Sequence, residues 1–501
     1  MLKPAPLFTD GAVLCRNRAI RVFGETDSGS EVSVTLTDRN GKILTEAACR
    51  SMNGRFLVLL CPQEAQTGCR LVIRAGTETT EAGDIAIGEV FLAGGQSNME
   101  LELQNADEGP EIIKEYNDPL LRFFNVPKFA VADQQQRKAN EETRWHAVSP
   151  GHGGENSAVA YFFAAKLRER MPGIPVGIIG CYWGGTSVTC WIEEEELRTT
   201  AEGSRYLDEY AARCGGKSME TWQEEDKAFW KMIDEWNRAV SEYQATHPDA
   251  PWKEVERACG PAPWNPPAGP GSPFRPAGLA ATMVREIVPV ALSGLLYYQG
   301  EQDAETTSQY DVLMKLLISS WRELFREKDL PFLFVQLPMW LNWDAEDNRC
   351  WAKLRLAQAK ARDEMPGTGM ICLLDQGEYG NIHPKVKRPV GERLADLAGE
   401  MLYGGGKVSP RALEKRTEGN SLAIRLSAPV KTRDGKEAAL LEIAGEDGRF
   451  VPARAEIQGD TLRLTAENTD HPTRVRYAWT DWSDRVNLYG ENGLPLEPFE
   501  L

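Results

Sequence analysis

The feature that most constrains the fold is an alternation of apolar and amphipathic segments between residues 86 and 400. Apolar runs of strand length occur at 90–93, 122–126, 176–181, 294–298, 332–337 and 370–374. Helical periodicity occurs between them at 158–170, 311–326, 351–364 and 385–401. This alternation predicts an α/β fold in which helices cover both faces of a parallel sheet. Catalytic residues then belong on loops at the carboxyl ends of the strands.

The two flanks of this region have a different pattern. Short β-branched runs separated by turns fill residues 1–85 and recur after residue 404, which is typical of small β-sandwich-type domains. We therefore predict an N-terminal β domain at 1–85, an α/β domain at 86–403 and a C-terminal β region at 404–501. An insertion interrupts the α/β domain at about 200–275.

The insertion contains two unusual segments. Apolar residues recur at helical spacing in its acidic first part, at Trp222, Phe229, Ile233, Trp236, Val240 and Tyr243. An amphipathic helix that packs on the core is the favoured interpretation, and a sugar-stacking platform is the alternative. The proline- and glycine-rich run at 260–273 excludes regular structure, so it is either a linker or a loop near the mouth of a site.

Charge and hydropathy exclude several classes of partner. The formal net charge of −17, from 57 basic and 74 acidic residues, argues against nucleic acid and against anionic membranes. There is no apolar stretch long enough to span a bilayer. Residues 1–6 lack the apolar segment of an export signal, and the ten cysteines are scattered, so we expect a cytoplasmic protein with reduced thiols. The oligomeric state is left open.

A candidate nucleophile follows the first apolar run. Val90 to Ala93 is succeeded by two glycines, and then Gln96, Ser97 and Asn98. A buried strand that ends in glycine and then presents a serine is how many α/β enzymes expose a nucleophile. Met99 occupies the position of the second glycine in the usual Gly-x-Ser-x-Gly elbow, and a simple turn with a hydrogen-bonding serine is the alternative.

The candidates for the general base are few, because the chain has five histidines. His383 alone follows the last core strand and precedes the last core helix, so it is the candidate base. His152, in a glycine-rich loop, is the alternative.

Three further segments carry a family resemblance. They are Gly294 to Ala304 with the sequence GLLYYQGEQDA, Asp375 to Lys385 with DQGEYGNIHPK, and the segment at 178–187 with IIGCYWGGTS. Together with the serine segment they resemble the sialate O-acetylesterase family, a branch of the SGNH (GDSL-like) carbohydrate esterases. The resemblance implies an SGNH-hydrolase-like three-layer core between the β flanks.

The resemblance also implies roles for individual residues. Ser97 and His383 would be nucleophile and base, and Gln299 and Gly185, with the Ser97 backbone N–H, would donate hydrogen bonds to the oxyanion. Gly184 is the alternative to Gly185. The predicted substrate-binding residues are Gln96, Asn98, Trp183 and Glu301.

The third member of the usual triad is missing. Gly380 stands where the superfamily has the aspartate of Asp-x-x-His, and Asn381 stands one position later. A Ser–His dyad in which a backbone carbonyl holds the imidazole is the leading interpretation. The alternative orienting residues are Asn381, Asp375, Glu378, Glu301 and Asp303.

These residues predict a serine esterase without metal or cofactor, because no metal-ligand spacing and no nucleotide-binding loop occurs. The resemblance implies a small-molecule or glycan substrate, O-acetylated sialic acid. An esterase for acetylated xylan or another polysaccharide is the alternative within enzymes. A non-catalytic glycan-binding protein is the alternative from another class, suggested by the β flanks and fourteen tryptophans.

Overall fold

The N-terminal region is built of strands, as its β-branched runs predict. The computed structural model describes residues 1–501 apart from Asp249, Asn265, Asp344 and Asn468 and the side chains of Thr307 and Ser308. β1, β3 and β6 form one sheet, and β4, β5, β7, β2 and the first half of β8 form part of a larger one. The strands are β1 (Lys3–Pro4), β2 (Val13–Cys15), β3 (Ile20–Glu25), β4 (Glu31–Thr37), β5 (Ile43–Arg50), β6 (Arg55–Leu60), β7 (Gln66–Ala75) and β8 (Glu78–Gly95).

The second half of β8 enters the central sheet, whose strand order is β10-β9-β11-β8-β12-β13-β14. All neighbouring pairs are parallel except β10 with β9. The predicted apolar runs therefore form a mainly parallel sheet. The strands are β9 (Asp118–Asn125), β10 (His146–Val148), β11 (Val176–Tyr182), β12 (Gly294–Tyr298), β13 (Phe332–Val335) and β14 (Thr368–Ile371). The domain division stays a prediction, and its first boundary falls inside β8.

Helices cover both faces of this sheet. Phe91 of β8 packs against Phe163 of α4 with ring centroids 4.8 Å apart, whereas a Cβ on Gly94 would lie 2.8 Å from the ring of Trp321 in α10. Residues three apart on a strand point to opposite faces, so α4 and α10 lie on opposite faces. α12 packs on α4, and α11 on α10. The bounds are α4 (Ala158–Arg170), α10 (Tyr310–Leu324), α11 (Cys350–Glu364) and α12 (Arg388–Leu402).

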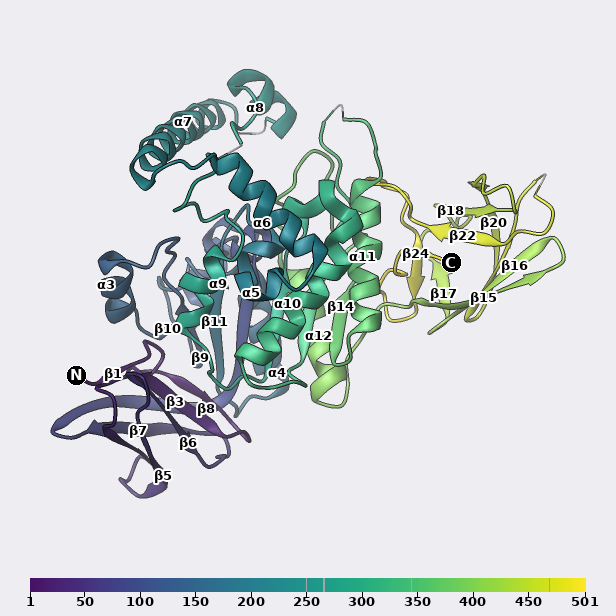
Figure 1. Ribbon diagram of the computed structural model, residues 1–501. Helices are drawn as coiled ribbons and strands as arrows, with labels where there is room; N and C mark the ends of the chain where they lie inside the picture. Colours follow the sequence, from purple (N-terminus) through teal and green to yellow (C-terminus); the bar gives the residue numbers. More distant parts are fainter. Residues whose placement is uncertain (249, 265, 344, 468) are drawn as a thin grey trace.

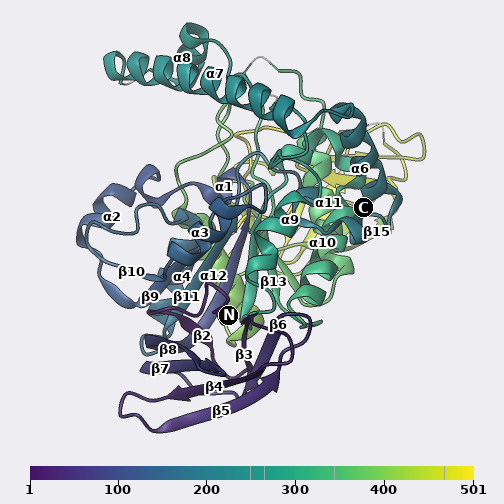
Figure 2. The same ribbon diagram turned by 60° about the vertical axis from the view of Figure 1, so that its left-hand side comes forward.

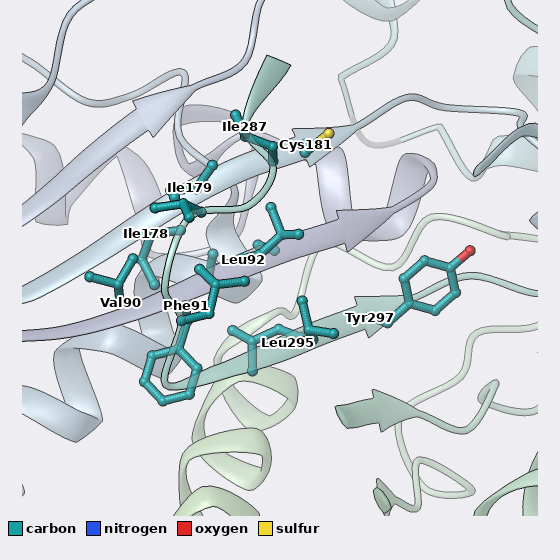
Figure 3. Packing of buried hydrophobic residues seen from close by; sticks show 14 of the residues in the cluster. Val90, Phe91, Leu92, Ile178, Ile179, Cys181, Ile287, Leu295 and Tyr297 are labelled. Atoms are coloured by element: carbon teal, nitrogen blue, oxygen red, sulfur yellow. The ribbon is translucent and has the colours of Figure 1, made fainter. Parts of the chain in front are cut away.

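The core explains why the strands read as continuous apolar runs. Buried side chains of β8, β11 and β12 belong to one hydrophobic cluster, which includes Val90, Ile178 and Leu295 (Figure 3). These residues are fully buried, because a parallel sheet with helices on both faces has no solvent-facing side. The predicted helix at 158–170 is confirmed together with its cap, since the hydroxyl of Ser157 accepts a hydrogen bond from the N–H of Ala160 at 3.1 Å.

The insertion forms helices on the side of the sheet where its parallel strands end (Figures 1 and 2). The predicted amphipathic helix is α7, but it packs on α8 and on the proline-rich run, not on the core as favoured. The Trp236 indole N–H donates to the carbonyl of Gly260 at 3.0 Å, and the rings of Trp236 and Trp252 lie 6.1 Å apart. The insertion and its flanks contain α5 (Glu194–Leu197), α6 (Ala201–Cys214), α7 (Met219–Thr246), α8 (Trp252–Cys259) and α9 (Gly278–Thr282).

The C-terminal region has a hydrophobic cluster of its own, which also includes Met339, Cys372 and Leu374 from the central region. Its sheets have the orders β15-β16-β21-β20, β17-β23 and β19-β18-β22-β24. The strands are β15 (Ala412–Glu418), β16 (Ser421–Leu426), β17 (Val430–Thr432), β18 (Leu441–Ala444), β19 (Val451–Pro452), β20 (Arg454–Gln458), β21 (Thr461–Thr465), β22 (Arg474–Tyr477), β23 (Leu488–Gly490) and β24 (Phe499–Glu500).

Three remaining helices lie between β8 and β10: α1 (Ser97–Glu100), α2 (Gly109–Glu115) and α3 (Gln134–Glu142). Among the described residues no helix is both long and apolar enough to cross a bilayer. The ten cysteines are all free thiols.

Candidate active site

The candidate nucleophile lies at the carboxyl end of β8, as the sequence predicts. Gly95 ends the strand with φ +135°, and a Cβ there would lie 2.1 Å from the carbonyl oxygen of Tyr298 on β12. Only glycine fits this close approach of two backbones. The chain then turns, and Ser97 becomes the first residue of α1. Met99 is fully buried, so the residue that replaces the second elbow glycine serves the core.

The candidate base lies beside this serine. Nε2 of His383, on the loop between β14 and α12, is 2.8 Å from Oγ of Ser97. The residue is exposed, yet the protein packed around the ring and the positive charge of Lys387 lower its pKa to about 4. The imidazole is therefore neutral at neutral pH and can accept a proton from the serine. His152, the alternative base, instead contacts the carbonyl of Pro150 at 3.3 Å.

The proposed orienting residues are engaged elsewhere. Asp375 forms a two-point ion pair with Arg393, at 2.7 and 2.8 Å. Asn381 accepts from the backbone N–H of His383 at 3.0 Å and donates to Glu378 at 2.7 Å, so it holds the loop and not the ring. Among the described residues, Nδ1 of His383 has no hydrogen-bond partner, neither a carboxylate nor the backbone carbonyl of the leading interpretation. The geometry is that of a serine–histidine pair.

The two glycines of the WGGT segment have different surroundings. The N–H of Gly184 donates to the carboxylate of Glu100, and a Cβ on Gly184 would lie 3.3 Å from Cβ of Ser97. The N–H of Gly185 has no acceptor in the part of the chain that the structure describes, and neither has that of Ser97. Gly185 and Ser97 thus have N–H groups free for a ligand, whereas Gly184 does not.

The structure contradicts the expectation that the Gln299 side chain donates to the oxyanion. Gln299 is 1% exposed, and its Nε2 donates to Gln96 and to the carbonyl of Thr186, both at 3.1 Å, and to Asp303 at 2.6 Å. An amide nitrogen has two hydrogens, so protein acceptors already use both. The buried carboxylate of Asp303 needs these donors, and that need overrides the expected role.

Asp303 is the centre of this buried network and does not reach His383. It also accepts from the hydroxyls of Ser187 at 2.6 Å and Tyr206 at 3.1 Å, and from the N–H of Val188 at 2.8 Å. Burial raises its pKa, although each of these bonds stabilises the ionised form. Asp303 therefore ties the WGGT segment to β12 and is not an orienting residue for the imidazole.

Asn98 and Glu301, both predicted to bind substrate, form a hydrogen bond with each other. Asn98 is 1% exposed; its amide nitrogen donates to Glu301 at 2.6 Å and to the carbonyl of Ile382 at 3.0 Å. Its carbonyl oxygen accepts from Nζ of Lys387 at 2.5 Å. Asn98 follows the nucleophile and Ile382 precedes the base, so this one side chain joins the two loops that carry the Ser97–His383 pair.

The remaining predicted binding residues lie at the strand ends. Gln96 is 3% exposed, and its side-chain carbonyl oxygen accepts a hydrogen bond from Gln299 at 3.1 Å. Gln96 is therefore part of the buried network next to the nucleophile. Trp183 donates its backbone N–H to the carbonyl of Gly95 at 3.1 Å and packs partly buried against the main core. Trp183 is therefore placed next to the nucleophile turn.

Two residues of the site were missed from sequence. Lys387 is 1% exposed, and burial lowers its pKa to about 8. Its place four residues after His383, amid a basic helix start, gave no signal that it would be buried. Trp264 of the proline-rich run covers Gly185: a Cβ on that glycine would lie 2.3 Å from the indole. The run is thus a loop at the site and not a linker, although its residue Asn265 lies outside the described residues.

The described residues include no group of three or more histidine, cysteine or carboxylate side chains arranged to hold a metal ion. The chemistry available at the site is that of a hydroxyl, a neutral imidazole and two free backbone N–H groups.

Comparisons with known proteins relate the chain to carbohydrate acetylesterases. Residues 278–398, which include His383, match the family model of a carbohydrate esterase described as a sialic acid-specific acetylesterase. Sialate O-acetylesterase of Rattus norvegicus is 23% identical over 95% of this chain and 90% of its own length, and that of Homo sapiens is 22% identical over 95% and 88%. A carbohydrate acetylesterase structure from Xanthomonas citri superposes with a TM-score of 0.76 at 27% identity, covering 100% of this chain and 99% of that one. Over 95% of its length the chain is thus similar to sialate O-acetylesterases.

Proposed function

We propose that this protein is a serine-dependent carbohydrate O-acetylesterase with Ser97 as nucleophile and His383 as base. The observation that carries the proposal is the 2.8 Å contact between Nε2 of His383 and Oγ of Ser97. The two residues are 286 positions apart in the chain, so the fold has to bring them together. The proposal includes an SGNH-type core for residues 86–403.

The reaction follows from these groups. The hydroxyl of Ser97 attacks the acetyl carbonyl carbon while His383 accepts its proton at Nε2. Collapse of the tetrahedral intermediate breaks the ester bond, and His383 gives the proton to the departing sugar hydroxyl. A water molecule, deprotonated by the same imidazole, then attacks the carbonyl carbon of the acetyl-enzyme. The bond between that carbon and Oγ of Ser97 breaks, His383 returns the proton to Oγ, and acetate leaves.

The developing oxyanion needs donors that no protein acceptor occupies. The backbone N–H groups of Ser97 and Gly185 meet this condition, whereas that of Gly184 is bound to Glu100. One such donor stabilises the transition state by about 3–4 kcal/mol. Trp264 packs over Gly185 and would help to exclude water from this position.

Two substrate classes are supported by different relatives. The curated relatives are named sialate O-acetylesterases, which favours O-acetylated sialic acid as substrate. The Xanthomonas citri structure, which matches over the whole chain, is named only as a carbohydrate acetylesterase. That name does not specify the sugar, so an acetylated polysaccharide such as acetylxylan is the second candidate.

The test is acetate release from 4-nitrophenyl acetate, from acetylated mucin sialic acid and from acetylxylan. Ser97→Ala and His383→Ala should each lower kcat by at least about 10³-fold on every accepted substrate. His152→Ala is the matched control and should keep wild-type activity. A fluorophosphonate probe should label Ser97 alone. Full activity in either pair variant, or glycan binding without labelling, would replace this proposal by the non-catalytic alternative.

A further inference from the structure

The C-terminal region contains a cavity that the proposed reaction does not use. It has a volume of about 830 Å³ and lies between the ends of β18 to β21 and the segment at 479–485. The side chains around it include Trp479, Trp482, Arg454 and Arg485. Both tryptophans are partly buried, whereas both arginines are exposed. This volume lies within the range that is usual for ligand-binding pockets.

The tryptophans of the cavity are held in fixed positions. The guanidinium of Arg476 lies 5.5 Å from the ring centre of Trp479 and 4.0 Å from that of Phe450. Nε of the same arginine donates to Glu442, another lining residue, at 2.6 Å. An aromatic ring that is immobilised before a ligand arrives loses little entropy on binding, so Trp479 is suited to stacking.

The segment that carries both tryptophans is fixed to the α/β body. The carbonyl of Asp481 accepts from the N–H of Trp340 at 2.8 Å, and its carboxylate accepts from the N–H of Ala352 at 2.9 Å. The fully buried guanidinium of Arg355 donates to the carbonyls of Ala478 and Thr480. The segment that carries both tryptophans therefore has a defined position relative to α11.

A row of aromatic rings leads from the cavity to the base loop. The ring of Trp482 lies 5.8 Å from that of Tyr379, which lies 4.7 Å from that of Trp343. Tyr379 is four residues before His383, on the same loop. One wall of the cavity is thus continuous with the loop that carries the candidate base.

The charges around the cavity balance. Arg454 and Arg485 have no carboxylate partner among the described residues, and two exposed glutamates, Glu437 and Glu467, also line the cavity. Hydrogen-bond donors and acceptors of both charges around two indole rings suit an uncharged ligand rich in hydroxyl groups and with apolar ring faces. They do not select an anion.

We propose that this cavity binds an uncharged oligosaccharide segment by stacking on Trp479 and Trp482. The statement that this segment and the acetylated sugar belong to one polysaccharide rests on the proposed function. The statement that the cavity binds an oligosaccharide does not. The cavity then adds affinity for long substrates and leaves small esters unaffected.

The binding experiment uses the full-length Ser97→Ala protein and isothermal titration with xylohexaose, cellohexaose and, as the anionic probe, 3′-sialyllactose. We expect one of the neutral hexaoses to bind, and Trp479→Ala and Trp482→Ala to raise its Kd at least about tenfold. Thr465→Trp, at an exposed lining position, fills the cavity without removing a contact and should do the same if a tryptophan variant fails to fold. Trp230→Ala, at the exposed face of α7, is the matched control and should leave Kd unchanged.

The kinetic experiment separates this site from the reaction centre. In the otherwise wild-type enzyme, the same cavity variants should raise KM for acetylxylan several-fold and keep kcat/KM for 4-nitrophenyl acetate within about twofold. Absence of binding of both hexaoses, binding that the cavity variants leave intact, or binding of 3′-sialyllactose alone would overturn the proposal. Failure of wild-type protein to hydrolyse 4-nitrophenyl acetate would refute the esterase proposal instead, because sugar binding by Ser97→Ala needs no catalysis.

Discussion

Replacing Asn98 with alanine should break the connection between the nucleophile and base loops. The substitution removes hydrogen bonds of 2.5 Å to Lys387, 2.6 Å to Glu301 and 3.0 Å to the carbonyl of Ile382. Each buried group left without a partner costs about 1–3 kcal/mol, so the three together should lower the free energy of unfolding by about 3–9 kcal/mol. A base loop displaced by about 1 Å should lower kcat about 100-fold.

The assay combines urea unfolding with kcat and KM for 4-nitrophenyl acetate. Asn105→Ala is the matched control, because Asn105 is exposed and its side chain donates a hydrogen bond to Glu102 alone among the described residues. Its effect should stay within about 0.5 kcal/mol. Wild-type stability and kcat in Asn98→Ala would refute the reasoning. A rise in KM alone, at unchanged stability, would instead restore the sequence prediction that Asn98 binds substrate.

Three more predictions concern the site and its supporting backbone. The acidic limb of the kcat/KM pH profile should lie near the His383 pKa of about 4, because activity needs the neutral imidazole. Lys387→Met removes a positive charge that lowers this pKa, so the acidic limb should move towards neutral pH. An acidic limb that does not move would contradict the assignment of His383 as base. Gly185→Ala places a methyl group 2.3 Å from the indole of Trp264, on a residue with φ +72°, and should lower kcat/KM at least about tenfold. The control Gly173→Ala, whose Cβ would lie in open space, should keep wild-type kcat/KM. Equal kcat/KM values for the two variants would remove Gly185 from the site. Gly95→Ala should destabilise the fold by about 3 kcal/mol or more, and a smaller loss in urea unfolding would mean that the strand end relaxes.

The helices and strands of the central region followed from local patterns. The run at 176–181 and strand β11 (Val176–Tyr182) nearly coincide, and the helix at 158–170 begins and ends where its cap and periodicity place it. Such elements are predictable because burial on one or both faces imposes a repeat that a short window of sequence contains. The partner of α7 was not predictable, because an apolar helix face does not specify which surface covers it.

The candidate pair was also identifiable from sequence. Ser97 follows a strand and glycines, and His383 is the one histidine between the last core strand and the last core helix. The supporting residues were not identifiable: Gln299 and Asn98, expected at the ligand, satisfy buried groups instead. Lys387 and Trp264 lie at the site but were not predicted from the sequence.

The amino-acid sequence by itself determined the alternating layers, the serine at the end of β8 and the histidine after β14, because each depends on neighbours within about twenty positions. Only the tertiary structure decided which amides remain free for a ligand. A buried carboxylate such as Asp303 must be satisfied by whichever donors the fold brings to it, and two of those donors, Ser187 and Val188, lie more than one hundred residues away.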